Sequence, residues 1–301
     1  MASPLSSLTL TQIRYFARTA ELGSMSGTAA EMYVAQSAVS TSIAHLEASL
    51  GTQLFIRQRS RGVVLTEAGH TFYRSAQTIL NAVDDAVDSL QPDRLTGTLT
   101  AGCFTTLAPF WLPEVHERLV SAYPDLEVRL REVDAEQIEP ILRRHDMEVV
   151  LTYGFDYGRT VDFEVLQEAP IYAAVAEDSH LAGRGSVTLE ELAEEPLILL
   201  DIGKSTNYFL SVFHNANLRP RVQERFESFE VVRSMAARGH GYTILNQRPA
   251  HDLSNDGRRL VTIPIDGARS NLQVGVAHRA DEELSQKGLA FLEQCREIFG
   301  A

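Results

Sequence analysis

The fold of this chain is decided by residues 8–69, which read LTLTQIRYFARTAELGSMSGTAAEMYVAQSAVSTSIAHLEASLGTQLFIRQRSRGVVLTEAG. After Thr9, whose hydroxyl can cap a helix, apolar residues recur at three- and four-residue steps, and Gly23 ends this predicted helix. A second short helix follows it. A third is predicted over residues 36–50, with Gly51 as its stop. Three short helices are therefore expected at the start of this stretch.

A pair of short strands is predicted after the third helix, over residues 54–59 and 61–65. Strand alternation places Arg57 and Arg59 on one face, and Arg61 lies at the turn between the strands. We expect the three guanidinium groups to contact a phosphate backbone, which supplies affinity without reading sequence. Helices followed by such a hairpin are typical of a winged helix-turn-helix, so the first functional hypothesis is binding to double-stranded DNA.

The outward face of the third helix is polar and almost uncharged. Its side chains are short or carry an amide, as the direct reading of base edges requires. A solvated helix face without a ligand is the alternative. The residues that we expect to read base edges are Gln36, Ser37, Ser40, Thr41 and His45.

This segment resembles the LysR-type transcriptional regulators, a family of bacterial repressors and activators. The resemblance rests on Phe16, Ala29-Ala30, Gln36-Ser37-Ala38-Val39-Ser40, Ile43, Leu46-Glu47, Leu50-Gly51, Leu54-Phe55, Arg57 and Gly62 through Gly69. It implies a winged helix-turn-helix domain at 1–65, a linker and dimerisation helix at 66–91 and an effector-binding domain at 95–301.

The chain departs from the family pattern at three places. Ala35 stands where the family usually has a serine that caps the third helix, and loss of such a cap costs about 1 kcal/mol unless another group replaces it. Basic residues that are frequent in the middle of that helix are replaced by Thr41, Ala44 and His45. Ile56 stands where an acidic residue is common. These differences shift the expected phosphate contacts toward the hairpin.

A long amphipathic helix is predicted after Thr66, with apolar residues that continue to Leu90. About 25 residues of helix span ~38 Å. Its apolar stripe packs either against the chain's own body or against a second copy. The resemblance favours a homodimer through this helix, which would present two heads to half-sites ~34 Å apart or a multiple of that, and it implies that dimers pair into a homotetramer.

From residue 95 onward strands and helices alternate, which predicts an α/β fold with a largely parallel sheet. Segments 172–176, 189–193 and 197–200 are among the expected strands. The last strand and helix return to the first set of elements, so two lobes are expected, at 95–167 with 268–301 and at 168–267. The family's effector domain resembles periplasmic-type solute-binding proteins in this respect.

A ligand in such a fold lies between the lobes at the strand ends, where helix N-termini expose amides that favour anions. By resemblance, Thr106 matches a hydroxyl that family members offer to effectors. Helix capping is the alternative for each hydroxyl, and a solvated position for Lys204. We expect a small polar or carboxylate-bearing effector, or an aromatic acid. The candidate contacts are Phe104, Thr105, Thr106, Tyr153, Lys204, Ser205, Thr206, Asn207, Ser228, Phe229 and Asn246.

Composition and charge indicate which classes of protein the chain can belong to. The chain has 301 residues, 44% of them hydrophobic, and a formal net charge of −13. Its first 65 residues hold more Arg than Glu, and a mildly positive head on an acidic body suits contact with nucleic acid at one end. No apolar run approaches the ~20 residues of a membrane span, and no secretion signal is visible. We expect a cytoplasmic protein without a membrane partner.

The two cysteines, Cys103 and Cys295, lack the spacing of a zinc site or a disulfide framework. We expect buried small hydrophobes, no metal and no cofactor. A reactive Cys103 near the effector pocket is the alternative. An enzyme is the rival class, but no GxSxG, HExxH or GxxxxGKS/T motif is present. The prediction is a regulator modulated by an effector, and the alternative is a cytoplasmic α/β small-molecule-binding protein or an enzyme without a recognisable motif.

Overall fold

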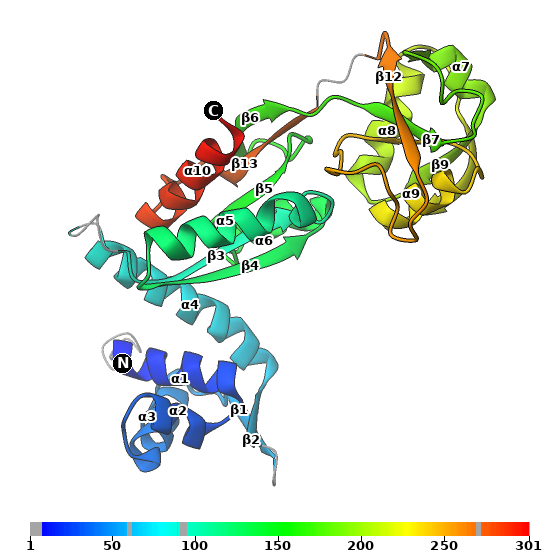
Figure 1. Ribbon diagram of the computed structural model, residues 1–301. Coiled ribbons are helices and arrows are strands. Elements are labelled where there is room, and N and C mark those ends of the chain that lie inside the picture. The colour runs from blue at the N-terminus through cyan, green and yellow to red at the C-terminus, as the bar shows by residue number, and fades with distance from the viewer. Residues whose placement is uncertain (1–7, 59–61, 89, 91–94, 269–271, 301) are drawn as a thin grey trace. The chain divides into compact units, whose positions relative to one another are not determined.

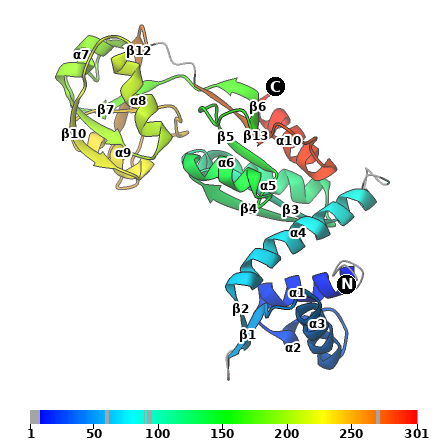
Figure 2. The same cartoon turned by 180° about the vertical axis from the view of Figure 1, so that it is seen from behind.

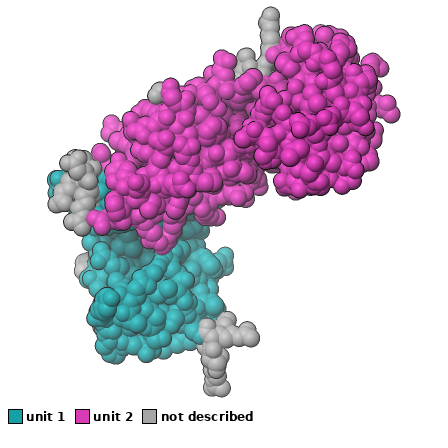
Figure 3. Space-filling view, in the orientation of Figure 1, with its two compact units in different colours: residues 1–98, 144–146 teal, residues 99–143, 147–301 magenta. Residues whose placement is uncertain are grey.

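The computed structural model describes residues 8–58, 62–88, 90, 95–268 and 272–300 (Figure 1). The described residues group into two compact units (Figure 3). The first holds residues up to Thr98 together with Arg144–Asp146, and the second holds the remainder. None of the described helices is long and apolar enough to cross a membrane.

The first unit contains the predicted helices and hairpin. Its elements are α1 (Leu10–Leu22), α2 (Met25–Glu31), α3 (Gln36–Leu50), the antiparallel pair β1 (Phe55–Gln58) and β2 (Gly62–Leu65), and α4 (Glu67–Asp88). The Thr9 hydroxyl accepts a hydrogen bond from the Gln12 amide, and the Gln12 side chain accepts one from Thr9, which confirms the expected cap. No side chain caps α3 at Ala35, so the missing cap is also confirmed.

The core of this unit is centred on the fully buried ring of Phe16 in α1. Its centroid lies 5.2 Å from that of Phe55 in β1 and 5.2 Å from that of Phe72 in α4. Val39 and Ile43 supply the buried face of α3 to the same core. Burying one aromatic side chain of this size contributes about 2–3 kcal/mol. One ring therefore joins the first helix, the hairpin and the long helix.

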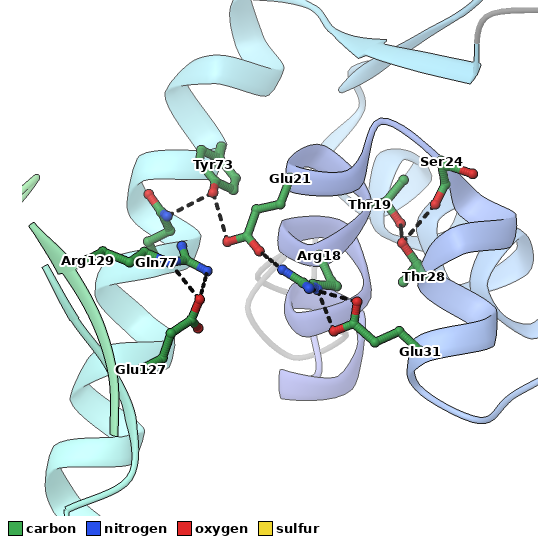
Figure 4. A network of polar contacts seen from close by, with 10 residues as sticks. All are labelled: Arg18, Thr19, Glu21, Ser24, Thr28, Glu31, Tyr73, Gln77, Glu127 and Arg129. Carbon is green, nitrogen blue, oxygen red and sulfur yellow. Dashed lines mark hydrogen bonds and ion pairs between the residues drawn. The ribbon is translucent and has the colours of Figure 1, made fainter. Parts of the chain in front are cut away.

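A polar network braces the outside of this core (Figure 4). The Arg18 guanidinium donates two hydrogen bonds of 2.7 Å to Glu31 of α2 and a further one to Glu21. The Tyr73 hydroxyl of α4 donates to Glu21 at 3.0 Å. These carboxylates raise the pKa of Arg18 above its usual value. Because Arg18 is neutralised, it adds less to the positive potential of this unit than its charge alone suggests.

The second unit is formed by two lobes of mixed sheet flanked by helices (Figures 1 and 2). The first lobe contains β3 (Gly97–Phe104), α5 (Ala108–Ala122), β4 (Leu126–Val133), α6 (Ala135–Arg143), β5 (Val149–Tyr153), β6 (Val161–Glu168), β13 (Gln273–Arg279) and α10 (Gln286–Phe299). Its sheet has the order β4-β3-β5-β13-β6. Helices α5 and α10 pack side by side (Figure 2).

The second lobe lies between β6 and β13 in sequence, so the chain leaves the first lobe once and returns once. It contains β7 (Tyr172–Ala176), β8 (Val187–Thr188), α7 (Leu189–Glu194), β9 (Pro196–Leu200), α8 (Lys204–His214), β10 (Arg221–Phe226), α9 (Phe229–Ala237), β11 (Thr243–Leu245) and β12 (Leu260–Asp266). Its strands pair in the orders β11-β7-β12-β8 and β10-β9. The two-lobed α/β architecture is as expected.

Two details of the expected fold are wrong. The sheets are mixed rather than largely parallel, because β13 runs antiparallel to β5 and β6, and β7 runs antiparallel to β11 and β12. Segment 189–193 belongs to helix α7 rather than to a strand. The Thr188 hydroxyl and the Glu191 carboxylate form a reciprocal capping box at its start, which satisfies the first backbone amides of a helix.

Candidate functional site

The outward face of α3 carries the side chains predicted to read bases. Four of them are exposed, namely Gln36, Ser37, Thr41 and His45. Ser40 is half-buried, and its hydroxyl accepts a hydrogen bond from Arg57 of β1 at 3.4 Å. This bond sets the Arg57 guanidinium beside the polar face of α3. Arg59 and Arg61 lie outside the described residues.

Glu47 fixes the hairpin against α3. Its carboxylate accepts hydrogen bonds from the backbone amides of Leu54 at 2.7 Å and Phe55 at 3.1 Å. At the other end of β1 and β2, Gly62 has a φ of +82° and packs against the Gly23 carbonyl so closely that a Cβ would overlap it. The hairpin backbone that carries Arg57 is thus anchored to α3 and to the end of α1.

A cavity of about 700 Å³ is lined by residues of both lobes of the second unit. Four of the predicted effector contacts line it: Thr105, Thr106, Ser228 and Phe229. The rings of Phe110 from α5 and Phe229 from α9 meet edge to face at 5.7 Å between centroids. The hydroxyl oxygen of Thr105 is buried without a hydrogen-bond partner in the structure. A volume of this size is typical of a small-molecule site.

A much smaller cavity, about 10 Å³, lies under Thr106 and is lined by Tyr153, Ser205 and Asn246. That volume holds at most one water molecule. Burial raises the pKa of Tyr153, whose hydroxyl is hydrogen-bonded to Thr106 and Gln247. The Asn246 amide donates to the Ala169 carbonyl at 2.7 Å. The structure therefore gives these predicted contacts internal partners beneath the larger cavity.

Four predicted effector contacts are not brought to either cavity. Phe104 is fully buried, with its ring 5.6 Å from that of Tyr153. The Lys204 ammonium group donates to the Asp156 carbonyl and lies 4.7 Å above the Tyr157 ring. The Thr206 hydroxyl donates to the Asp201 carboxylate at 2.7 Å, and Asn207 is exposed outside both linings. Hydrogen bonds and packing within the protein account for the first three.

The walls of the larger cavity are acidic, a feature that was not predicted from the sequence. Its carboxylates are Asp134, Glu136, Asp201, Glu227 and Glu230. Three of them directly follow strands β4, β9 and β10, so acidic residues at the carboxyl ends of strands were the available signal.

Two of these carboxylates have cationic partners. Glu230 accepts a hydrogen bond from Arg233 at 3.0 Å, and Asp201 pairs with Arg225 at 3.4 Å. Arg233 is only 1% exposed and also donates to the Leu253 carbonyl at 2.8 Å. Among the residues that the structure describes, the other three carboxylates form no ion pair. The cavity consequently carries an excess of negative charge.

The N-terminus of α8 already faces a carboxylate. Gly203 caps this helix with a φ of +46°, and a Cβ at this position would overlap the Glu136 carboxylate of the first lobe. A carboxylate beside the exposed amides of a helix start is electrostatically favourable. The helix end that was expected to favour an anionic effector is thus occupied by a side chain of the protein.

Both cysteines are buried, as expected. Burial raises the pKa of Cys295 to about 12 and raises that of Cys103 well above its ordinary value. Thiols with raised pKa values and no exposure react slowly, because the thiolate is the nucleophile. The alternative of a reactive Cys103 finds no support in this geometry.

Comparison with known proteins decides the family. Residues 92–300 match the LysR substrate binding domain, and residues 10–70 match the bacterial regulatory helix-turn-helix protein of the lysR family. The chain belongs to the LysR family of transcriptional regulators. It is therefore a DNA-binding regulator with an effector-binding domain, and the family is one of regulators rather than enzymes.

Solved structures and relatives agree with this assignment along nearly the whole chain. HinK, a LysR family transcriptional regulator from Pseudomonas aeruginosa, is 32% identical and has a TM-score of 0.64, covering 97% of this chain and 99% of HinK. The PA01 protein of the same organism is 33% identical with a TM-score of 0.66, covering 98% and 100% of the two chains. The regulator YnfL of Escherichia coli is 30% identical over 247 residues, which are 78% of this chain and 81% of YnfL.

The contact between Gly203 and Glu136 can be tested through the single tryptophan, Trp111, whose indole donates to Gln247 of the other lobe at 3.3 Å. Gly203→Ala should lower stability by about 1–3 kcal/mol and shift Trp111 fluorescence, because the new methyl group displaces the carboxylate. Adding Glu136→Ala should recover part of both effects. Thermal unfolding and emission spectra measure them.

The matched control is Gly158→Ala, since Gly158 also has a positive φ but faces open space. This variant should lose stability only through backbone strain, and its Trp111 emission should be unchanged. Equal behaviour of the two glycine variants would contradict the contact.

Proposed function

We propose that this LysR regulator reads an operator through residues 1–65, pairs through residues 66–91 and binds its effector with residues 95–301. Base contacts are assigned to Gln36, Ser37, Ser40, Thr41 and His45, and phosphate contacts to Arg57, Arg59 and Arg61. Because its target is DNA, we infer that it acts in the cytoplasm. The hydrogen bond from Arg57 to Ser40 carries the DNA-binding assignment, since it sets a phosphate-binding cation beside the base-reading face.

The distribution of apolar side chains along α4 supports a homodimer. Phe72, Ala76 and Leu80 of this helix pack against the core of their own unit. Other apolar residues of the same helix are exposed, Ile79 by 40% and Val87 by 54%. One set of apolar side chains thus packs against the chain's own body, and the exposed set is available to a second copy. We infer a two-fold dimer through α4, and pairing of dimers into a tetramer as the family resemblance implies.

The effector class follows from the charge of the cavity. Bringing an anion next to unpaired Asp134, Glu136 and Glu227 would be unfavourable, whereas an ammonium or guanidinium group would gain charge-assisted hydrogen bonds. We therefore replace the expectation of a carboxylate effector with an organic cation. The Phe110 and Phe229 rings offer an apolar wall to its carbon skeleton.

The DNA assignment predicts a change in salt dependence. For a dimer bound to a duplex enriched from a random pool, Arg57→Ala should reduce the slope of log affinity against log salt by about 1.8, since each lost phosphate contact contributes about 0.9. Gln36→Ala should instead reduce discrimination between that duplex and a scrambled one. Fluorescence anisotropy at several salt concentrations measures both. Arg118→Ala, in the other unit, is the control, and an unchanged slope for Arg57→Ala would refute the phosphate contact.

The effector assignment predicts that amines bind and matched carboxylates do not. Phenethylamine should raise the thermal midpoint and change Trp111 fluorescence at concentrations where phenylacetate does neither. Glu227→Gln should weaken amine binding about tenfold or more, because it removes one charge-assisted hydrogen bond. Glu117→Gln, an exposed position outside the cavity lining, should have no effect. Binding of the carboxylate alone would overturn the cationic effector and leave the DNA assignment intact.

A further inference from the structure

Tyr33 lies in the turn between α2 and α3 with a left-handed backbone, at a φ of +54°. Among the described residues only two other non-glycine positions share a positive φ, His145 and Asn217. Glycine and asparagine adopt this region readily, whereas a bulky side chain there is strained. The backbone of this turn therefore does not account for a tyrosine.

Packing does not account for it either. The Tyr33 side chain is 95% exposed, the largest exposed fraction given for any large apolar or aromatic side chain in the described residues. It has no ring contact or hydrogen bond with any residue that the structure describes. The residues around it are held by the backbone, through the bond from the Val34 amide to the Ala29 carbonyl at 3.0 Å. An aromatic ring held in water on a strained backbone contributes little to folding.

The position of Tyr33 suggests what the ring contacts. It precedes Gln36 by three residues, so the two Cα atoms lie within about 11 Å of one another. It also lies two residues before Ala35, the uncapped start of α3. If Gln36 and Ser37 face bases, a phenol projecting from this point is within reach of the flanking DNA strand. Tyrosine hydroxyls commonly donate to phosphate oxygens and so fix the register of a recognition helix.

We propose that Tyr33 is a positioning residue whose hydroxyl donates to a backbone phosphate beside the first bases read by α3. The inference rests on the proposed role of α3. Unlike the guanidinium group of Arg57, the Tyr33 hydroxyl is a neutral hydrogen-bond donor. The hydroxyl therefore increases the affinity and fixes the position of α3 on the DNA without displacing a counterion, so it does not change the salt dependence of binding.

The test compares Tyr33→Phe with Tyr33→Asn in the full-length protein. Tyr33→Phe should weaken binding to the enriched duplex about ten- to thirtyfold for a dimer, with an unchanged salt slope and an unchanged thermal midpoint, because only the hydroxyl is lost. Tyr33→Asn should lose the same affinity and raise the thermal midpoint, since asparagine suits the left-handed region. A structural role alone would move the midpoint and not the affinity.

Tyr15→Phe, at a half-buried position of α1 in the same unit, is the matched control and should bind like the wild type. Wild-type affinity of Tyr33→Phe overturns the proposal, and because this variant keeps ring and backbone, failure to fold is no obstacle. A loss of salt dependence in Tyr33→Phe also contradicts it. If Gln36→Ala and Arg57→Ala still show their expected defects, α3 keeps its role and only the Tyr33 contact is rejected.

Discussion

The burial of the Phe16 ring is the constraint on which the DNA-facing unit depends. Rings from the hairpin and from α4 both lie 5.2 Å from it. The core is therefore shared by α3, which we propose reads bases, the strand that carries Arg57, and α4, which we propose pairs two copies. Glu47 of α3 also anchors the hairpin, because its carboxylate accepts hydrogen bonds from two backbone amides at the start of β1. Packed side chains rather than a loop therefore connect α4 to α3.

In the second unit, the charge of the cavity rather than the packing of a core determines the proposed function. Asp134 and Glu136 give the cavity a negative wall that the buried Arg233, paired with Glu230, leaves uncompensated. Glu136 also occupies the start of α8 at Gly203. A cationic ligand would compete with that helix for the Glu136 carboxylate. Ligand binding and the contact between the lobes would therefore involve the same carboxylate. Such sharing is how a ligand with different affinities for two arrangements shifts their populations.

Features that depend on neighbouring residues could be predicted from the sequence, whereas features that depend on residues distant in sequence could not. The cap at Thr9 and its absence at Ala35 were predictable because capping depends on neighbours within one turn. The pairing of Arg18 with another helix and the mixed sheets depend on partners distant in sequence. Segment 189–193 was misassigned as a strand although Thr188 and Glu191 form a capping box at its start, because five residues are too few to distinguish a strand from a helix by their apolar period. Lys204 was predicted to face the effector, but a carbonyl and a tyrosine ring in the other lobe hold it away.

We propose that two copies of this chain, related by a two-fold axis, read DNA with α3. Selection of bound sequences from a pool of random duplexes, followed by sequencing, tests it most directly and requires no knowledge of the natural operator. We expect enrichment of inverted half-sites whose centres lie about 34 Å apart or a multiple of that distance. Enrichment of a single unpaired motif would contradict the two-fold dimer, and the absence of any enrichment would contradict base reading by α3.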